Sequence, residues 1–290
     1  MTYLYQALEC AKLIQIVEAS CIKNCEETLK VEVEKRGVRY LNTLYTSALA
    51  NFISASSGPE VMFGFTGIDR NENFIVVLRC TETFSEALHD IAFIPIPSSI
   101  KGSAFTLVGS GFLRLFQSLK FKQPNATFSN NVKERIEEFC TFPSKRNVII
   151  CGHSLGGALA TLLALDLALN TQIREPEVYT FGSPRVGDVF FARKYNKVVT
   201  NSNRFITPYD PVQTIPILPS YWHVNEARPL ELNWRTIKLN PLCWHHISTY
   251  IHALSKIIPG IDIIPLESKC IPTVTVWDKL KEKVSKWWNK

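Results

Sequence analysis

The segment with the clearest chemical potential is a Gly-x-Ser-x-Gly sequence centred on Ser154. It joins the apolar run 147–151, typical of a strand buried on both faces, to the apolar residues 155–169, which predict a long buried helix. Glycines around a serine let a strand and a helix approach at a sharp turn, which presents the hydroxyl at a helix N-terminus. The sequence therefore predicts a nucleophilic serine. Its flanking elbow residues are Gly152, His153 and Gly156.

A serine hydroxyl becomes a strong nucleophile only when a base removes its proton, and histidine suits this role because its pKa lies near neutrality. In folds with this turn an acid follows the serine along the chain and the histidine follows the acid. That order favours the adjacent pair His245 and His246, just before an apolar helical pattern, and spacing alone leaves both open. His153, beside the serine, is expected to point its side chain away from the site.

The acid that orients the histidine should follow a strand between the serine and the histidine pair. Asp210 follows the strand-like run 204–206 and precedes Pro211, which prevents a helix from continuing. Sites in open α/β sheets form at the carboxyl ends of strands, so we expect Asp210 to lie at the site. A plain Asp-Pro turn is the alternative. Asp166 and Asp188 are less suited, because one lies within the predicted helix and the other in a turn.

Negative charge that develops on the ester oxygen needs two backbone N–H donors. One is expected from Leu155, directly after the serine. The other is expected from the segment 79–81, which follows an apolar run and in which Thr81 adds a hydroxyl. This chemistry requires neither a metal nor an organic cofactor.

The elements that position these groups alternate between strand and helix. A turn sequence at 69–73 separates two short apolar runs and predicts a hairpin, whereas the apolar, proline-broken segment 91–100 is expected to be a loop. The order predicts an α/β fold with a mostly parallel central sheet and helices on both faces. Helices are expected at 3–19, 132–139 and 155–169, and strands at 61–66, 74–78, 147–151, 178–181 and 204–206.

Composition excludes several classes of protein. With 46% hydrophobic and 20% charged residues the chain is not disordered, and 32 Lys and Arg against 26 Asp and Glu is too small an excess to indicate a nucleic-acid partner. We see neither an apolar run that could span a membrane nor a basic N-terminal start typical of a secretory signal. We therefore expect a cytoplasmic protein, with peripheral membrane contact as an option. These features leave the oligomeric state open.

The eight cysteines show no Cys-x-x-Cys pair and no spacing typical of metal ligands. Cys21 and Cys25 are a minor candidate for a metal site, because no second pair of ligands accompanies them at matching spacing. We expect the cysteines to be buried free thiols in a reducing compartment.

The C-terminal residues 266–290 differ from the domain predicted over 1–265. Within 274–290 apolar residues recur at helical spacing, with lysines between them. The pattern predicts a basic amphipathic helix that either lies on an anionic membrane or lipid-droplet surface or docks its apolar face on the domain. The apolar residues are Trp277, Leu280, Val284, Trp287 and Trp288.

Residues 61–254 resemble the class 3 (fungal-type) lipase family of the α/β-hydrolase superfamily. Gly-His-Ser-Leu-Gly-Gly at 152–157 is similar to the family's nucleophile elbow. Tyr-Thr-Phe-Gly-Ser-Pro-Arg-Val-Gly-Asp at 179–188 is similar to a segment specific to the family. Tyr-Asp-Pro-Val at 209–212 is similar to the segment that carries its acid, Asp210 here.

The same resemblance implies roles for other segments. His245 and Tyr250 are similar to the family's His-x-x-x-x-Tyr ending, which favours His245 over His246 as the base. Arg-Cys-Thr at 79–81 is similar to the oxyanion segment, with Cys80 where the family usually has glycine. The family's mobile lid falls at 84–96. The candidate lid residues are Phe84, Ala87, Leu88, Asp90, Ile91 and Phe93.

The resemblance implies an α/β-hydrolase fold and a serine esterase of lipid metabolism, either a lipase or a phospholipase. Such an enzyme cleaves acyl-lipid carboxyl esters through the triad Ser154, Asp210 and His245 and an acyl-enzyme intermediate. Its partner is the acyl-lipid substrate. Two alternatives stay open: a catalytically silent lipase-fold protein used for binding or signalling, and a soluble short-chain esterase.

Overall fold

The computed structural model of the 290-residue chain describes residues 2–22, 25–47, 60–79, 93–122, 128–141, 146–233 and 235–272. Several sequence predictions fall outside these ranges: the oxyanion residue Thr81, most of the candidate lid, and the amphipathic tail 274–290. The lid residues concerned are Phe84, Ala87, Leu88, Asp90 and Ile91. The domain boundary at residue 265 stays a prediction.

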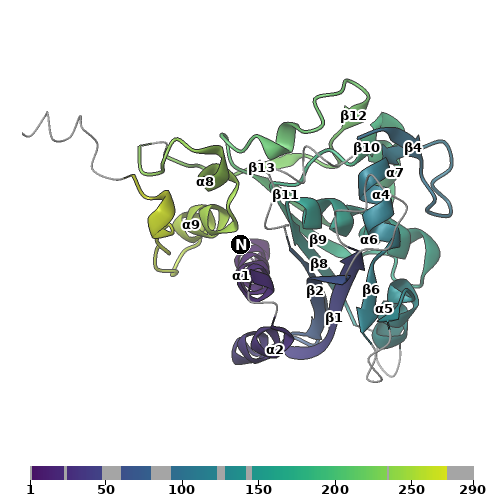
Figure 1. Ribbon diagram of the computed structural model, residues 1–290, viewed down its shortest axis with the longest axis horizontal. Helices are drawn as coiled ribbons and strands as arrows, with labels where there is room; N and C mark the ends of the chain where they lie inside the picture. Colours follow the sequence, from purple (N-terminus) through teal and green to yellow (C-terminus); the bar gives the residue numbers. More distant parts are fainter. Residues whose placement is uncertain are drawn as a thin grey trace, which may run out of the picture.

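A large mixed sheet forms the centre of the protein (Figure 1). Its strands follow the order β13-β11-β9-β8-β3-β2-β1-β6-β7. The pairings from β13 to β3 are parallel and those from β3 to β7 are antiparallel. The predicted α/β fold is confirmed, with its parallel part confined to one half of the sheet. The strands are β1 (Arg39–Ser47), β2 (Glu60–Ile68), β3 (Phe74–Leu78), β6 (Lys120–Lys122), β7 (Phe128–Ser129), β8 (Val148–His153), β9 (Glu177–Phe181), β11 (Ser202–Ile206) and β13 (Ala227–Pro229).

Helices cover both faces of this sheet (Figure 1). One face packs against α1, α2 and α9, and the other against α4, α5, α6 and α7. Neighbouring strand residues alternate between the faces, as in β8, where Ile149 contacts the first group and Ile150 the second. The helices are α1 (Thr2–Ile22), α2 (Glu26–Lys35), α4 (Ser110–Gln117), α5 (Val132–Thr141), α6 (Leu155–Asn170), α7 (Val189–Val198), α8 (Pro241–His245) and α9 (Ile247–Ile257).

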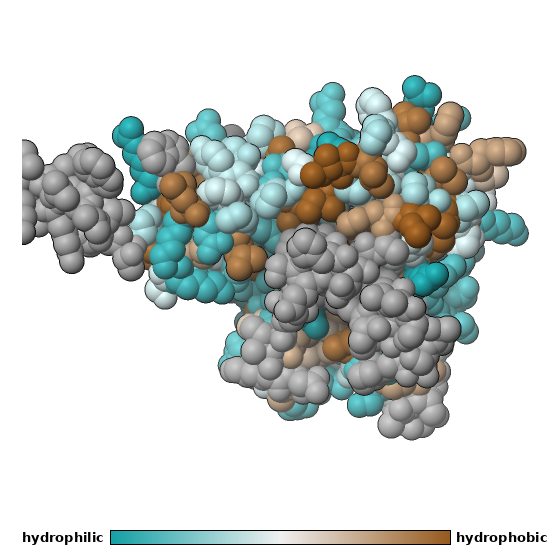
Figure 2. Space-filling view, turned by 45° about the horizontal axis from the view of Figure 1, so that its top comes forward, coloured by the Kyte–Doolittle hydropathy of each residue, from teal (hydrophilic) through white to brown (hydrophobic). Residues whose placement is uncertain are grey.

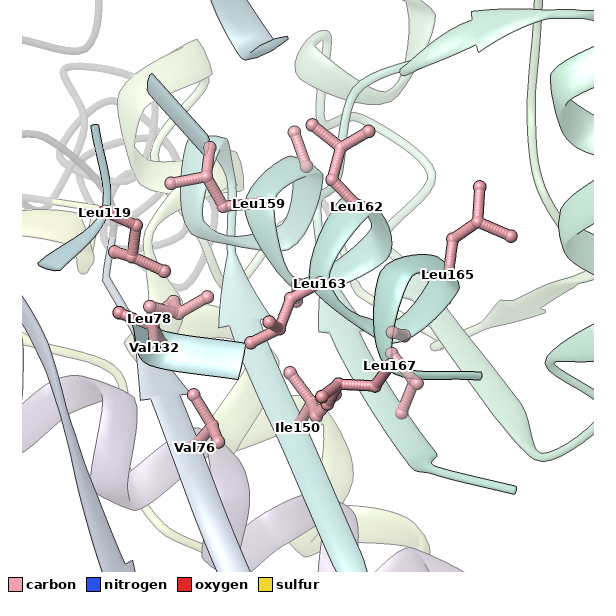
Figure 3. Packing of buried hydrophobic residues seen from close by; sticks show 14 of the residues in the cluster. Val76, Leu78, Leu119, Val132, Ile150, Leu159, Leu162, Leu163, Leu165 and Leu167 are labelled. Atoms are coloured by element: carbon pink, nitrogen blue, oxygen red, sulfur yellow. The ribbon is translucent and has the colours of Figure 1, made fainter. Parts of the chain in front are cut away.

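Helix α6 is the centre of the second face. Its sequence is apolar all round rather than on one stripe, and its residues from Leu155 to Ala168 are buried. Figure 3 shows Leu163 and Leu167 of α6 facing Ile150 of β8, whereas Leu162 and Leu165 point to the other side of the helix. This packing fixes the N-terminus of α6 at the carboxyl edge of the sheet, where the predicted serine lies.

The structure corrects the expected loop at 91–100. Pro95–Pro97 forms a short strand, β4, which pairs with β5 (Leu107–Gly109). Prolines are tolerated there because β4 lies at the edge of a small second sheet of order β12-β10-β5-β4, where ladder donors are not required. The remaining strands of this sheet are β10 (Gly187–Asp188) and β12 (Tyr221–Trp222), and short 3-10 turns lie at Val212–Thr214 and Ser268–Cys270.

The expectation of free thiols throughout was wrong for two cysteines. Cys243 on α8 and Cys270 form a disulfide, so the chain before and after α9 is joined covalently. Five other cysteines of the described residues are free, and four of them are buried. Sequence spacing could not reveal this pair, because connectivity depends on the fold. No helix within the described ranges is both long and apolar enough to cross a bilayer.

Candidate active site

Ser154 occupies the turn between β8 and α6. Its backbone has φ 56° and ψ −123°, a region that residues other than glycine rarely adopt, and its main-chain N–H donates to the Phe181 carbonyl at 2.9 Å. The side chain is fully buried, and among the described residues its Oγ has no hydrogen-bond partner. Strained backbone of this kind gathers at functional sites, because the surrounding packing must hold it in place.

Two glycines allow the close approach of strand and helix around this serine. A Cβ on Gly152 would lie 2.2 Å from the Gly156 carbonyl oxygen, and a Cβ on Gly156 would lie 2.5 Å from the carbonyl oxygens of Leu78 and Arg79. No larger residue fits either position without moving the main chain. Gly152 and Gly156, two of the elbow residues named from the sequence, therefore shape this turn by their lack of a side chain.

His245 and Asp210 meet at the same edge of the sheet. His245 ends α8, Asp210 lies in the loop after β11, and His245 Nδ1 lies 2.7 Å from Asp210 Oδ2. Both are buried. The carboxylate also accepts hydrogen bonds from the Tyr250 hydroxyl at 2.5 Å and from the Val212 main-chain N–H at 2.9 Å. These donors stabilise an ionised Asp210, which in turn orients the His245 ring.

The electrostatics around His245 favour a neutral ring. Burial lowers its pKa, the Asp210 carboxylate raises it, and His153 lowers it, so that the pKa lies below its ordinary value. A neutral ring with Nδ1–H donated to Asp210 carries a lone pair on Nε2 and can accept a proton. Burial and Asp210 raise the pKa of Tyr250 well above its ordinary value, which keeps the hydroxyl a donor.

His246, the other member of the pair that spacing left open, has different contacts. Its Nδ1 lies 2.9 Å from the Ser248 Oγ, and its Nε2 lies 2.9 Å from Lys269 Nζ. The side chain thus faces the segment around the Ser268–Cys270 turn. Of the two histidines, His245 is the one in contact with Asp210.

Gly182, in the family-specific segment, lies against this histidine–aspartate pair. Its φ is 55°, and a Cβ there would lie 2.5 Å from Asp210 Oδ2, 2.9 Å from the Tyr250 hydroxyl and 3.0 Å from His245 Cε1. The carbonyl of Phe181, the residue before Gly182, accepts the main-chain N–H of Ser154. The segment therefore contacts the serine, the acid and the histidine. Sequence reasoning weighted this segment through its resemblance but gave Gly182 no role.

Replacing Gly182 by alanine is expected to lower the free energy of unfolding by about 2–4 kcal/mol, the sum of an unfavourable φ and an overpacked contact. Any ester hydrolysis should fall by about 10²-fold, because the acid and histidine must shift. Thermal unfolding and kcat measure the two effects. The matched control is Gly260→Ala, since Gly260 has φ 75° with nothing within 4 Å of its Cβ position. Equal effects of both substitutions on kcat would contradict this role.

The prediction for His153 was wrong. Its side chain does not point away from the site: its ring stacks on that of His245, with centroids 4.6 Å apart. Its Nδ1 lies 2.8 Å from Glu18 Oε1 on α1, and its Nε2 lies 2.7 Å from the His245 carbonyl oxygen. Sequence reasoning missed Glu18, because α1 also carries Glu9 and nothing in the sequence of the helix distinguishes the two carboxylates.

The predicted oxyanion donors are described only in part. Leu155 begins α6, and N–H groups in the first turn of a helix have no intrahelical acceptor. Its N–H is therefore available beside Ser154. Thr81 lies outside the described residues. Phe93, the last candidate lid residue, packs its ring against that of Phe112, with centroids 5.7 Å apart.

Comparisons with known proteins agree on one family. The family model "Lipase (class 3)" matches residues 75–219. Phospholipase A1-Igamma2, chloroplastic, from Arabidopsis thaliana is 32% identical over 174 residues, which cover 54% of this chain and 32% of the relative. A lipase from Rhizomucor miehei is 30% identical over 154 residues, covering 52% of this chain and 39% of the relative. The chain thus matches only 32% and 39% of the length of these two curated relatives.

Solved structures show the same fold. The Yarrowia lipolytica LIP2 lipase superposes with a TM-score of 0.61 at 19% identity, covering 80% of this chain and 81% of the other. A lipase from Rhizopus microsporus var. chinensis gives 0.60 at 21% identity, covering 79% and 75%. The family match spans half of the chain and includes Ser154 and Asp210. This chain belongs to the class 3 lipase family of the α/β-hydrolase superfamily.

Proposed function

We propose that this protein is a serine carboxyl-ester hydrolase that acts on acyl lipids through Ser154, Asp210 and His245. The observation that carries the proposal is the 2.7 Å contact between His245 Nδ1 and Asp210 Oδ2 beside a buried serine with strained backbone. Ser154 is tied to this pair on two sides. The residue before Ser154, His153, stacks on His245. The main-chain N–H of Ser154 donates to the carbonyl of Phe181, which precedes Gly182.

In the proposed reaction His245 Nε2 accepts the proton of Ser154 Oγ as the oxygen attacks the ester carbonyl carbon. The resulting oxyanion accepts a hydrogen bond from the Leu155 N–H. The family resemblance implies a second hydrogen bond from Thr81. The bond between the former carbonyl carbon and the alkoxy oxygen then breaks, and His245 gives its proton to that oxygen, so that the alcohol leaves. Water attacks the acyl-serine with His245 again as base, releasing the fatty acid and restoring Ser154. Asp210 stays ionised and holds the ring throughout.

A lipid rather than a small soluble ester is favoured by two observations. The curated relatives are named lipases and phospholipases. Exposed apolar side chains lie on and around the small sheet, among them Phe105 (96% exposed) and Ile217 (83% exposed). Figure 2 turns the upper end of Figure 1, where β4 and β12 lie, toward the viewer and shows apolar side chains gathered there. Such a surface suits contact with lipid.

The location and surface contacts are part of the same proposal. Residues 274–290 are proposed to bring the protein to an anionic membrane or lipid-droplet surface through lysines and tryptophans. The cytoplasmic location expected from the sequence stays a prediction. The Cys243–Cys270 disulfide favours an oxidising compartment instead, because reducing compartments keep cysteines in the thiol form.

The test is labelling with a fluorophosphonate, combined with a panel of esters of increasing acyl length. We expect covalent labelling and hydrolysis that rises when long-chain substrates aggregate. A protein that neither takes the label nor hydrolyses any ester would be the silent binding protein. Labelling with activity that falls steadily with acyl length, and that ignores aggregation, would indicate the soluble short-chain esterase.

A further inference from the structure

Beneath His245 lies a buried histidine with an acceptor at each ring nitrogen. The side chain of His153 is 3% exposed, its Nδ1 lies 2.8 Å from Glu18 Oε1, and its Nε2 lies 2.7 Å from the His245 carbonyl oxygen. A carbonyl and an ionised carboxylate only accept hydrogen bonds, and a neutral imidazole has only one N–H to donate. With Glu18 ionised, both contacts are hydrogen bonds only when the ring carries both protons and is an imidazolium.

The surroundings support this charge state. Burial lowers the pKa of His153, but the Glu18 carboxylate and the hydrogen bonds to Glu18 and to the His245 carbonyl outweigh burial, so the pKa lies above its ordinary value. Glu18 comes from α1, which packs against β8 and α9. The pair therefore joins the first helix of the chain to the main chain of the proposed base.

The charged ring has two effects on His245. Its hydrogen bond to the His245 carbonyl fixes the main chain at the end of α8. Its ring plane, inclined 28° to that of His245 with centroids 4.6 Å apart, places a positive charge directly under the base. A cation there opposes protonation of His245. The Glu18 carboxylate, on the far side of His153, favours protonation of His245, but its effect is weaker.

We propose that Glu18 is a positioning residue for the hydrolytic reaction, because it keeps His153 charged, and charged His153 holds the His245 main chain and keeps its ring neutral. This inference rests on the proposed function of His245 as the base. It adds a residue from α1 to the site, 135 positions from His153 in the chain.

The other charged and titratable groups around His245 come from several elements. Asp210 from the loop after β11 bonds Nδ1, and Tyr250 of α9 bonds Asp210. His246 follows in the chain, with Glu267 and Lys269 beyond it. The partner of His153 Nδ1 is Glu18, whose Oε1 lies 2.8 Å away. A change at Glu18 therefore acts on His245 mainly through His153, because the direct effect of the Glu18 charge on His245 is weaker than that of His153.

Glu18→Gln separates charge from shape. A glutamine amide has the size of the carboxylate, and its N–H can donate to Nδ1 of a neutral His153, which still donates from Nε2 to the His245 carbonyl. The variant therefore keeps both hydrogen bonds and removes the imidazolium. The matched control is Glu9→Gln on the same helix, since Glu9 is half-exposed and pairs with Lys12 and Arg36.

The first measurement is the protonation of the histidine rings by ¹⁵N NMR across a pH titration, with His153→Gln and His245→Gln spectra for assignment. In the wild-type protein we expect His153 to be an imidazolium at neutral pH. In Glu18→Gln we expect it to be neutral and the pKa of His245 to rise by about 0.5–1 unit. This measurement needs no catalytic activity.

The second measurement is the pH profile of kcat/KM for an ester. A higher pKa of the base moves the acid limb up by the same amount, so Glu18→Gln should lose about 3–10-fold at pH values below that limb and approach wild-type rates above it. Glu9→Gln should leave the profile in place. A merely structural role of Glu18 would lower the rate equally at all pH values and overturn the proposal.

The outcomes are distinguishable from failure of the proposed function. A neutral His153 in the wild-type protein overturns the ion pair, and an unchanged His245 pKa in Glu18→Gln overturns the positioning role. If no ester is hydrolysed, the proposed function fails, and the two titrations still decide whether Glu18 controls the charge at His153 and His245.

Discussion

Replacing Ser154 by alanine is expected to reduce kcat for ester hydrolysis by about 10⁴-fold or more, because the attacking oxygen is gone and only binding and oxyanion contacts remain. The fold should be retained: alanine fits a site where the serine side chain is fully buried and its Oγ has no hydrogen-bond partner among the described residues. Fatty-acid release from a dispersed acylglycerol measures the rate, and fluorophosphonate labelling should disappear with it.

The matched control for Ser154 is another buried serine. Ser103 is 1% exposed and donates to the Ile100 carbonyl at 2.6 Å, away from the histidine–aspartate pair in its contacts. Ser103→Ala should lower the free energy of unfolding by about 1–2 kcal/mol through the lost contacts of its hydroxyl with Ile100 and Ser98, and leave kcat and labelling unchanged. Ester hydrolysis that survives Ser154→Ala would remove the nucleophile from the proposed mechanism.

Replacing Asp210 by asparagine is expected to reduce kcat by about 10³–10⁴-fold with little change in shape. An asparagine amide donates to His245 Nδ1, which moves the ring proton to Nε2 and leaves no lone pair to accept the serine proton. The carboxylate also raises the pKa of His245, so its loss should move the acid limb of the residual activity to lower pH. That direction is opposite to the one expected for Glu18→Gln.

Tyr250→Phe is the control for Asp210. It removes one hydrogen bond to Asp210 Oδ2 and keeps the carboxylate, the ring and the contact with His245. We expect a loss of about tenfold or less, since a single hydrogen bond to a charged group contributes about 1.5–3 kcal/mol and its neighbours partly compensate. A loss as large as that of Asp210→Asn would mean that Tyr250 rather than the carboxylate controls the ring.

The serine turn could be predicted because its signals are local. A continuous apolar strand, small residues and an apolar helix follow one another from 147 to 169, and the structure has β8, the turn and α6 there. The hairpin of β2 and β3 and the helix α1 are confirmed for the same reason. In each case the pattern within a few residues decides the element.

The small sheet could not be predicted, because its strands are two or three residues long and show no periodicity. Pro95 and Pro97 argued for a loop, and only the position of β4 at an edge makes a strand compatible with them. Tertiary pairing, which the local sequence does not contain, decides these elements. The Cys243–Cys270 disulfide depends on the fold in the same way.

The candidate site divides along the same line. Order along the chain and turn chemistry were enough to name Asp210 and, with the resemblance, to prefer His245. The roles of Gly182 and Glu18 follow only from contacts across the molecule: a missing Cβ that leaves room for Asp210, and a carboxylate on α1 that reaches His153. A single sequence carries no signal for contacts between segments so far apart.

The wide separation of Glu18 and His245 along the chain has a consequence for synthesis. The ribosome completes His153 92 residues before His245, an interval of about 5–18 seconds at usual translation rates. Until the later segment emerges, the charged ring has no carbonyl to bond and Ser154 has no base. The proposed ester-cleaving centre can therefore be assembled only after the segment that carries His245 has left the ribosome.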